Sequence, residues 1–202
     1  MRPPVPLALI AAAAVLLAGC SRDPGPGPAA AGEPVPVLSM ADCAALTAPP
    51  PDAPATAGHS ADQLPELTLP CFVDEQPFPL AQLRGPAVVN LWASFCLPCL
   101  EELPVLQRFA DRAAGQVHVV GVVTADSHTK AAWLADDLDL RFPSLYDRDE
   151  RLSIALGRYG LPVTAFVDAQ GRLVHVYQGE PFDDQRLGAL VEEHLGVAVE
   201  GG

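Results

Sequence analysis

Between Leu64 and Leu195 the spacing of apolar positions changes repeatedly, as in a chain that alternates strands and helices. Nearly unbroken apolar runs at 87–92 and 117–124 predict strands that are buried on both faces. Apolar residues three and four positions apart predict helices over 97–114, 130–138, 152–158 and 183–195. Shorter strands are predicted at 67–73, 163–167 and 173–178, and residues 78–83 as an edge strand or a turn.

Two short signals connect these elements. Asp168-Ala-Gln-Gly171 predicts a hairpin turn between 163–167 and 173–178. Gly196 predicts the end of the last helix, since glycine readily takes the left-handed conformation found there. The resulting order predicts an α/β fold, a mixed central sheet with helices on both faces.

The first residues indicate export. Val5–Ala18 is an apolar run too short to span a bilayer but suited to the core of a signal peptide. The run ends in Leu17-Ala18-Gly19-Cys20, which resembles a bacterial lipobox and predicts that Cys20 is lipidated. The alternative is an ordinary secretory signal with a chance cysteine. We therefore expect a lipid-anchored protein at the extracytoplasmic face of the cell membrane, where disulfides persist.

Composition divides the chain into three parts. Residues 1–19 are the predicted signal peptide, residues 20–62 a tether and N-terminal extension rich in Pro, Ala and Gly, and residues 63–199 the folded domain. A tether of this composition cannot bury a core and is expected to be extended. Within the extension, residues 37–46 are more apolar and predict a short helix that carries Cys43.

The net charge limits the partners. Twenty-five acidic residues against 12 basic ones give a net charge of −13. This excludes nucleic acid and anionic membrane surfaces as direct partners, because both are polyanions. Membrane contact is then expected through the lipid anchor only, and we expect a monomer.

The candidate chemistry is at Cys96-Leu97-Pro98-Cys99, between a predicted strand and a predicted helix. Free N–H groups and the dipole at a helix N-terminus favour a thiolate on Cys96, whereas Cys99 lies one turn inside and is expected to be more buried. Pro98 suits the first helical turn. A zinc half-site and a static disulfide are the alternatives. Zinc lacks a second ligand pair, because Cys43 and Cys71 are 28 positions apart with no close His. No metal and no cofactor are expected.

The stretch Val88–Cys99, followed by Glu102-Leu103-Pro104, resembles the thioredoxin superfamily. It is most similar to the membrane-tethered TlpA/ResA-like thiol–disulfide oxidoreductases, and the likeness extends from about Leu64 to Leu195, including Leu83–Gly85 and Tyr159–Asp168. The resemblance implies a thioredoxin-like fold with a redox-active cysteine pair. Two departures, Phe95 in place of a second Trp and the Leu-Pro dipeptide, leave the direction of electron flow open.

The resemblance also implies a substrate site. Pro162 corresponds to the cis-proline that lies against the cysteine pair, and the backbone of Leu161 would pair with a substrate strand. We expect the substrate-binding surroundings of the pair to comprise Trp92, Leu97, Pro98, Leu161 and Pro162, with Trp92 packing beneath.

Glu102 is a candidate proton acceptor. It shares a helical face with Cys99 and with an apolar stripe, so burial would raise the pKa of its carboxyl group. The carboxylate can then take a proton from Cys99, a role that the resemblance supports. Thioredoxin has an Asp in the central strand where Asn90 stands here, and Asn cannot titrate. The alternative is a solvated helix carboxylate.

Lipidation of Cys20 leaves Cys43 and Cys71 as a second pair. In an oxidising compartment they most simply form a structural disulfide, which would clamp the N-terminal extension onto the first strand. The alternative is a second redox couple that relays electrons to Cys96 and Cys99.

These observations predict a thiol–disulfide oxidoreductase in which Cys96 attacks a client disulfide and Cys99, assisted by Glu102, resolves the mixed disulfide. Exported cysteine-containing proteins are the expected clients, apocytochrome c among them by resemblance, and a membrane thiol protein the electron donor. A non-catalytic binding lipoprotein on a thioredoxin scaffold is one alternative. A peroxiredoxin-like enzyme is another, disfavoured because the reactive pair is Cys-x-x-Cys and does not form a Thr-x-x-Cys peroxide site.

Overall fold

The computed structural model describes residues 36, 38–53 and 62–199. The predicted signal peptide, Cys20 and most of the predicted tether therefore lie outside the described residues. The boundary predicted between the extension and the folded domain, at residues 62 and 63, falls at the start of the described range 62–199.

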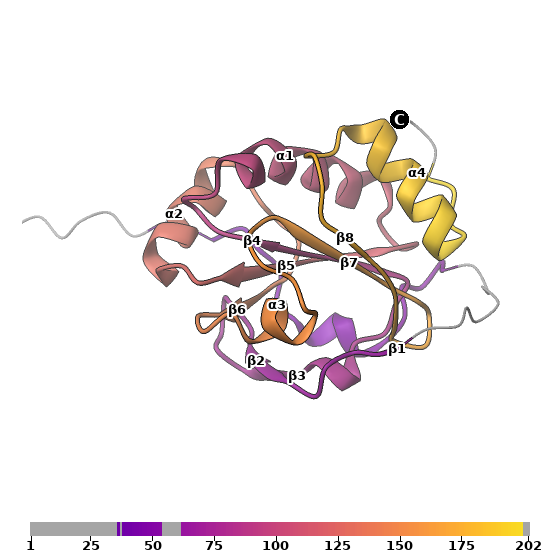
Figure 1. Cartoon of the computed structure of the whole chain (residues 1–202), viewed down its shortest axis with the longest axis horizontal. Helices are drawn as coiled ribbons and strands as arrows, with labels where there is room; N and C mark the ends of the chain where they lie inside the picture. Colours follow the sequence, from indigo (N-terminus) through magenta and orange to yellow (C-terminus); the bar gives the residue numbers. More distant parts are fainter. Residues whose placement is uncertain (1–35, 37, 54–61, 200–202) are drawn as a thin grey trace, which may run out of the picture. The chain divides into compact units, whose positions relative to one another are not determined.

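A six-stranded sheet in the order β1-β8-β7-β4-β5-β6 forms the centre of the described part (Figure 1). Its members are β1 (Asp62–Gln63), β4 (Ala87–Trp92), β5 (His118–Thr124), β6 (Ser144–Asp147), β7 (Val163–Val167) and β8 (Arg172–Tyr177). β4, β5 and β6 are parallel, whereas β7 is antiparallel to β4 and β8 to β7. A separate antiparallel pair consists of β2 (Thr68–Pro70) and β3 (Pro77–Pro79).

Helices cover both faces of the sheet. One face carries α1 (Leu97–Arg112), α2 (His128–Asp137) and α4 (Asp184–Leu195), whose apolar side chains share one core cluster. The other face carries α3 (Arg151–Ala155) and the β2–β3 pair, with the 3₁₀ helices η1 (Ala44–Thr47) and η2 (Leu80–Gln82) (Figure 1). The predicted α/β fold with a mixed sheet is confirmed.

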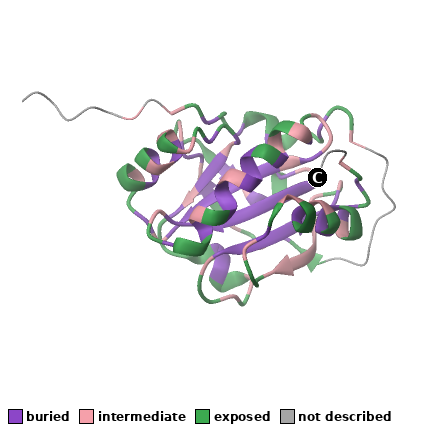
Figure 2. Ribbon diagram, turned by 90° about the horizontal axis from the view of Figure 1, so that it is seen from above, coloured by how far each residue is buried: buried purple, intermediate pink, exposed green. Residues whose placement is uncertain are grey.

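The strand β4 separates the two halves of the core. Val88 and Trp92 belong to the cluster under α1, whereas Val89 and Leu91 belong to the opposite cluster, as the alternation of side chains in a strand requires. All six residues of β4 are buried, which the continuous apolar run predicted (Figure 2). Asn90 is the one polar residue of this strand, and it lies on the face under α1.

Two strands were not predicted. β6 is four residues long, follows a proline, and contains the buried polar residues Ser144 and Asp147, so it has no apolar run. β1 consists of two exposed polar residues that pair with β8. Both strands are specified by main-chain pairing with a neighbour rather than by their own side chains. Residues 78–83 contain both expected possibilities, since the end of β3 is followed directly by η2.

The N-terminal extension is fastened to the domain. Cys43 precedes η1 and forms a disulfide with Cys71, with a Cα–Cα distance of 5.9 Å, and both residues are buried. The helix predicted over 37–46 was misplaced, because the observed turn starts at Ala44. Main-chain hydrogen bonds add to the attachment: Arg84 N–H donates to the Leu46 carbonyl at 3.0 Å, and Asp52 N–H donates to the Gly115 carbonyl at 2.7 Å.

Replacing Cys43 and Cys71 together by Ser is expected to lower the free energy of unfolding by ~3–4 kcal/mol, because the loop between them becomes unrestrained in the unfolded chain. Denaturant unfolding of the oxidised proteins measures this. A Cys96→Ser/Cys99→Ser protein is the control and should lose less, since its loop is far shorter. An unfolding midpoint equal to that of the wild type would rule out a structural role and favour the electron relay.

Candidate active site

The cysteine pair stands where the central strand passes into a helix. β4 ends at Trp92 and α1 begins at Leu97, with Cys96 as the N-cap residue in an extended conformation. Cys96 and Cys99 form a disulfide with a Cα–Cα distance of 5.2 Å. Pro98 lies in the first turn of α1, where its missing N–H leaves no gap in the helix hydrogen bonds.

The two sulfurs differ in accessibility. Cys96 is 8% exposed, and Cys99 is fully buried. The Cys99 N–H donates to the Cys96 Sγ at 3.3 Å. A donor at the helix N-terminus stabilises negative charge on Cys96 once the disulfide opens. Of the two cysteines only Cys96 has any exposed surface, and its sulfur is the one that accepts from the helix N-terminus.

The loop before β7 lies at the same edge of the sheet. The peptide bond between Leu161 and Pro162 is cis. In the antiparallel β4–β7 ladder the last paired residues are Leu91 and Val163. Pro162, directly before β7, therefore lies next to the end of β4. Leu161 packs against the core cluster that contains Cys96 and Cys99.

The expected substrate residues divide into accessible and inaccessible ones. Leu97 is 73% exposed, Pro98 is exposed and Leu161 is half-buried, so each can meet a partner. The side chain of Pro162 is buried and contributes the shape of the loop. Substrate contact by Trp92 is corrected by the structure, because its side chain is fully buried under α1 and only packs beneath the site.

Two exposed aromatic side chains were not predicted as site residues. Phe95, directly before Cys96, is 66% exposed, and Tyr159, two residues before Leu161, is 83% exposed. The Gln178 side-chain amide donates to the carbonyls of Tyr159 and Gly160 at 2.8 and 3.1 Å. Both residues lie within the stretches that resemble the thioredoxin superfamily, but only the structure shows that their side chains are exposed.

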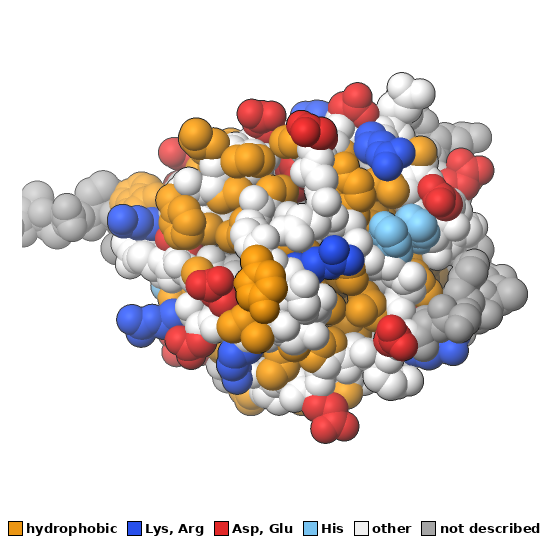
Figure 3. Space-filling model, viewed as in Figure 1, with side chains coloured by type: hydrophobic (Ala, Val, Ile, Leu, Met, Phe, Trp, Pro, Cys, Tyr) orange, Lys and Arg blue, Asp and Glu red, His pale blue; other side chains and the backbone are white. Residues whose placement is uncertain are grey.

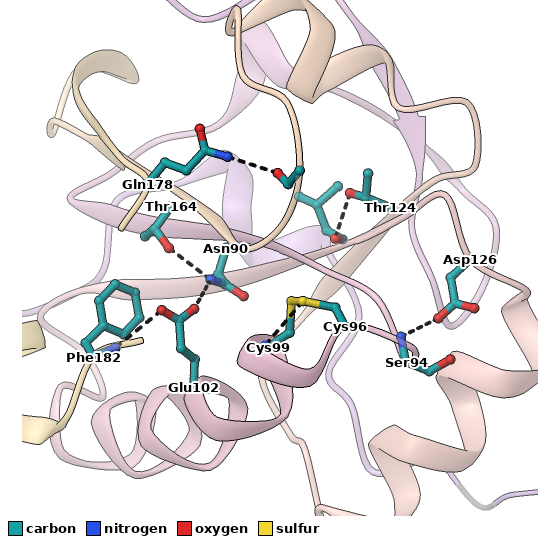
Figure 4. The surroundings of a disulfide bond; sticks show 12 residues. Asn90, Ser94, Cys96, Cys99, Glu102, Thr124, Asp126, Thr164, Gln178 and Phe182 are labelled. Carbon is teal, nitrogen blue, oxygen red and sulfur yellow. Dashed lines mark hydrogen bonds between the residues drawn. A yellow bond between two sulfur atoms is a disulfide. The ribbon is translucent and has the colours of Figure 1, made fainter. Parts of the chain in front are cut away.

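Asp126 was also missed. Its carboxylate accepts a hydrogen bond from the Ser94 N–H at 2.5 Å (Figure 4). It accepts a second one from the Ser127 N–H at 2.7 Å. The residue is buried and connects the end of β5 to the loop that carries Cys96. Its position just after a predicted strand parallel to β4 was the signal, because parallel strands end at one edge of a sheet.

Glu102 lies one turn of α1 beyond Cys99 and is 1% exposed. The Phe182 N–H donates to its Oε1 at 3.3 Å, and the Asn90 amide donates to its Oε2 at 3.2 Å (Figure 4). Burial raises the pKa of Glu102 to about 7, against the two hydrogen bonds, which lower it. The alternative of a solvated helix carboxylate is therefore wrong. A carboxyl group with this pKa exchanges protons near neutral pH.

A cysteine pair at a helix N-terminus, next to a cis-proline loop on a sheet of this order, defines a thioredoxin-like class of dithiol–disulfide proteins. The Redoxin family model matches residues 59–190. The DsbE thiol:disulfide interchange protein of Pseudomonas fluorescens biotype C is 37% identical over 122 residues, which is 57% of this chain and 64% of that protein. The thiol-disulfide oxidoreductase ResA of Oceanobacillus iheyensis is 28% identical over 58% of this chain and 62% of that protein.

Among solved structures, Mycobacterium tuberculosis DsbF in its mixed oxidized and reduced forms superposes with a TM-score of 0.57 and 26% identity. That match covers 63% of this chain and 94% of the other. The chain belongs to the Redoxin family and, within the thioredoxin superfamily, to the DsbE/ResA-like thiol:disulfide oxidoreductases. The chain spans slightly less than two thirds of the length of these two curated relatives.

Proposed function

We propose that this protein reduces or exchanges disulfides in exported client proteins through Cys96 and Cys99. The observation that carries the proposal is the pairing of a slightly exposed cysteine at a helix N-terminus with a fully buried one, one turn from a carboxyl group whose pKa is about 7. This arrangement suits an attacking thiol followed by a resolving thiol that must first lose a proton.

The reaction has two exchange steps. The Cys96 thiolate attacks a client disulfide, so that a Cys96–client disulfide forms and one client thiolate leaves. Glu102 then takes the proton of the Cys99 thiol, and the Cys99 thiolate attacks the Cys96 sulfur. This re-forms the Cys96–Cys99 disulfide and releases the second client thiolate, so two electrons pass to the client. A membrane thiol protein would return the two electrons by exchange with Cys96.

The client surface is proposed to consist of Phe95, Leu97 and Tyr159 together with the main chain of Leu161. Exposed apolar side chains next to a reactive sulfur suit a client segment with apolar residues beside its cysteine. Hydrophobic side chains also lie exposed between scattered charges on the face shown in Figure 3. Exported proteins that are unfolded around their cysteines, apocytochrome c among them, offer such segments.

The protein is proposed to work outside the cytoplasm on a lipid anchor at Cys20, as the lipobox predicts. In the described part of the chain, no helix has the length and apolar character needed to cross a bilayer. Replacing Cys20 by Ser is expected to release the processed protein from membranes or to block its processing. Fractionation and metabolic labelling with a fatty acid check this. A processed Cys20→Ser protein that stays membrane-bound would rule out the lipobox.

Reduction of insulin by dithiothreitol, followed by turbidity, tests the proposed activity. The wild type should accelerate precipitation, and a Cys96→Ser/Cys99→Ser protein should not. A wild type that is inactive in this assay would favour a non-catalytic binding lipoprotein. The reduction potential of the Cys96–Cys99 couple against glutathione then sets the direction, because a low potential favours a reductase and a high one an oxidase.

A further inference from the structure

The carboxylate of Glu102 belongs to a buried hydrogen-bond chain that runs from α1 to two neighbouring strands of the central sheet. Asn90 of β4 is 1% exposed and donates from the same amide nitrogen to Glu102 Oε2 at 3.2 Å and to the Thr164 hydroxyl at 2.9 Å (Figure 4). Asn90 and Thr164 are direct cross-strand partners in the β4–β7 ladder. Thr164 is also 1% exposed, and it follows the cis-proline Pro162 by two residues.

The side-chain amide of Asn90 can only donate through its nitrogen, which fixes the direction of both hydrogen bonds. The amide nitrogen carries two hydrogens, and Thr164 and Glu102 each accept one of them. The bond to Thr164 fixes the amide so that its other hydrogen faces Glu102. Glu102 then has one donor on each oxygen, Asn90 on Oε2 and the Phe182 N–H on Oε1. Two donors suit a carboxylate, which only accepts, better than a carboxylic acid.

We propose that Asn90, held by Thr164, is a positioning residue that orients the Glu102 carboxylate and stabilises its charged form. The proposal rests on the proton-accepting role of Glu102 in the proposed function. No charged side chain contributes to the shift in the pKa of Glu102, whose causes are burial and the hydrogen bonds from Phe182 and Asn90. The titratable groups beside it are Cys99 and Cys96 after reduction, and in the disulfide form neither titrates.

Titration of the Glu102 carboxyl group in the disulfide form tests the proposal. The carboxyl carbon of ¹³C-labelled glutamate is followed by NMR, and Glu102→Gln assigns the signal. Asn90→Leu, whose side chain branches in the same way with the same number of heavy atoms, removes the donor and should move the midpoint upward by roughly one to two pH units. Thr164→Val keeps the shape and touches Glu102 only through Asn90, so it should move the midpoint upward by less. Ser153→Ala, a buried site on α3, is the control and should move nothing.

The double variant Asn90→Leu/Thr164→Val decides whether Thr164 acts through Asn90. The Thr164→Val effect should vanish once Asn90 is gone. An unmoved midpoint in Asn90→Leu, or an equal Thr164→Val effect with and without Asn90, would overturn the proposal. Failure of the proposed function looks different: the midpoint would move in Asn90→Leu while the pH profile of mixed-disulfide resolution stayed in place.

Discussion

Cells that produce the Cys99→Ser protein are expected to accumulate mixed disulfides between Cys96 and client proteins, and cells that produce Cys96→Ser are expected to accumulate few or none. The reason is the difference in access between the two sulfurs. Cys96 is the N-cap residue of α1 and is 8% exposed, whereas Cys99, one turn further along the helix, is fully buried. Without Cys99, the first exchange step proceeds and the second cannot.

Non-reducing electrophoresis of acid-quenched cells, followed by mass spectrometry of the trapped species, measures this difference. The contrast should be nearly all-or-none, because loss of the resolving thiol removes the rapid route by which the mixed disulfide decays. Cys43→Ser/Cys71→Ser is the control and should trap no more than the wild type if that disulfide is structural. Trapping by Cys96→Ser as strong as by Cys99→Ser would reverse or abolish the proposed roles.

The trapped species also test the client surface. Tyr159→Ala and Phe95→Ala, each in the Cys99→Ser background, should reduce the amount trapped without changing the Cys96–Cys99 chemistry. Both side chains are largely exposed, so their removal leaves the core intact. Trp133→Ala, an exposed aromatic residue on α2, is the matched control.

Most of the fold followed from patterns that are local in sequence. The apolar runs of β4 and β5 and the three- and four-residue spacing in α1 and α4 each identify an element by its own residues. β6 was not predicted, because its buried residues Ser144 and Asp147 are polar and the strand is stabilised by its pairing with β5. Strands that depend on a neighbour leave a weak signal in their own sequence.

The site divides in the same way. Cys96, Cys99 and Glu102 share one helix, and their spacing places them together before any tertiary structure is known. Thr164 reaches the site from β7, Asp126 from the segment just after β5, and Gln178 reaches the loop beside the site from beyond β8. Each does so across a distance in sequence that no local pattern encodes. The outward direction of Tyr159 and the complete burial of Trp92 likewise depend on how the loops and α1 pack over the sheet.

Replacing Glu102 by Gln is expected to slow resolution at neutral pH while leaving the first exchange step intact. Gln preserves the shape but cannot accept the proton of Cys99, and general-base assistance contributes on the order of 10²-fold or more. Single-turnover resolution of a Cys96–client disulfide, measured from pH 6 to pH 10, checks this. The defect should shrink at high pH, where Cys99 ionises unaided. Glu101→Gln, at an exposed position on the same helix, is the control.

The same substitution, which slows resolution, should make the protein more stable relative to the wild type as the pH rises. The pKa of Glu102 is raised to about 7 in the folded protein from an ordinary value of 4.5, so the folded state binds the proton more tightly than the unfolded chain. The stability that this proton contributes is complete below pH 4.5 and is lost as the pH rises through 7. The difference in free energy of unfolding between wild type and Glu102→Gln should therefore shift against the wild type by up to about 3 kcal/mol between pH 4.5 and pH 8.

Denaturant unfolding of both oxidised proteins at these two pH values measures the shift. Oxidised protein is required, because the cysteines then do not titrate. A proton acceptor for Cys99 must be buried beside it, even though the ionised form of a buried carboxyl group lowers the stability of the fold. If resolution rates in Glu102→Gln match the wild type across pH while the stability shift is present, Glu102 is a buried structural carboxyl. If neither changes, the carboxyl group is not desolvated in solution.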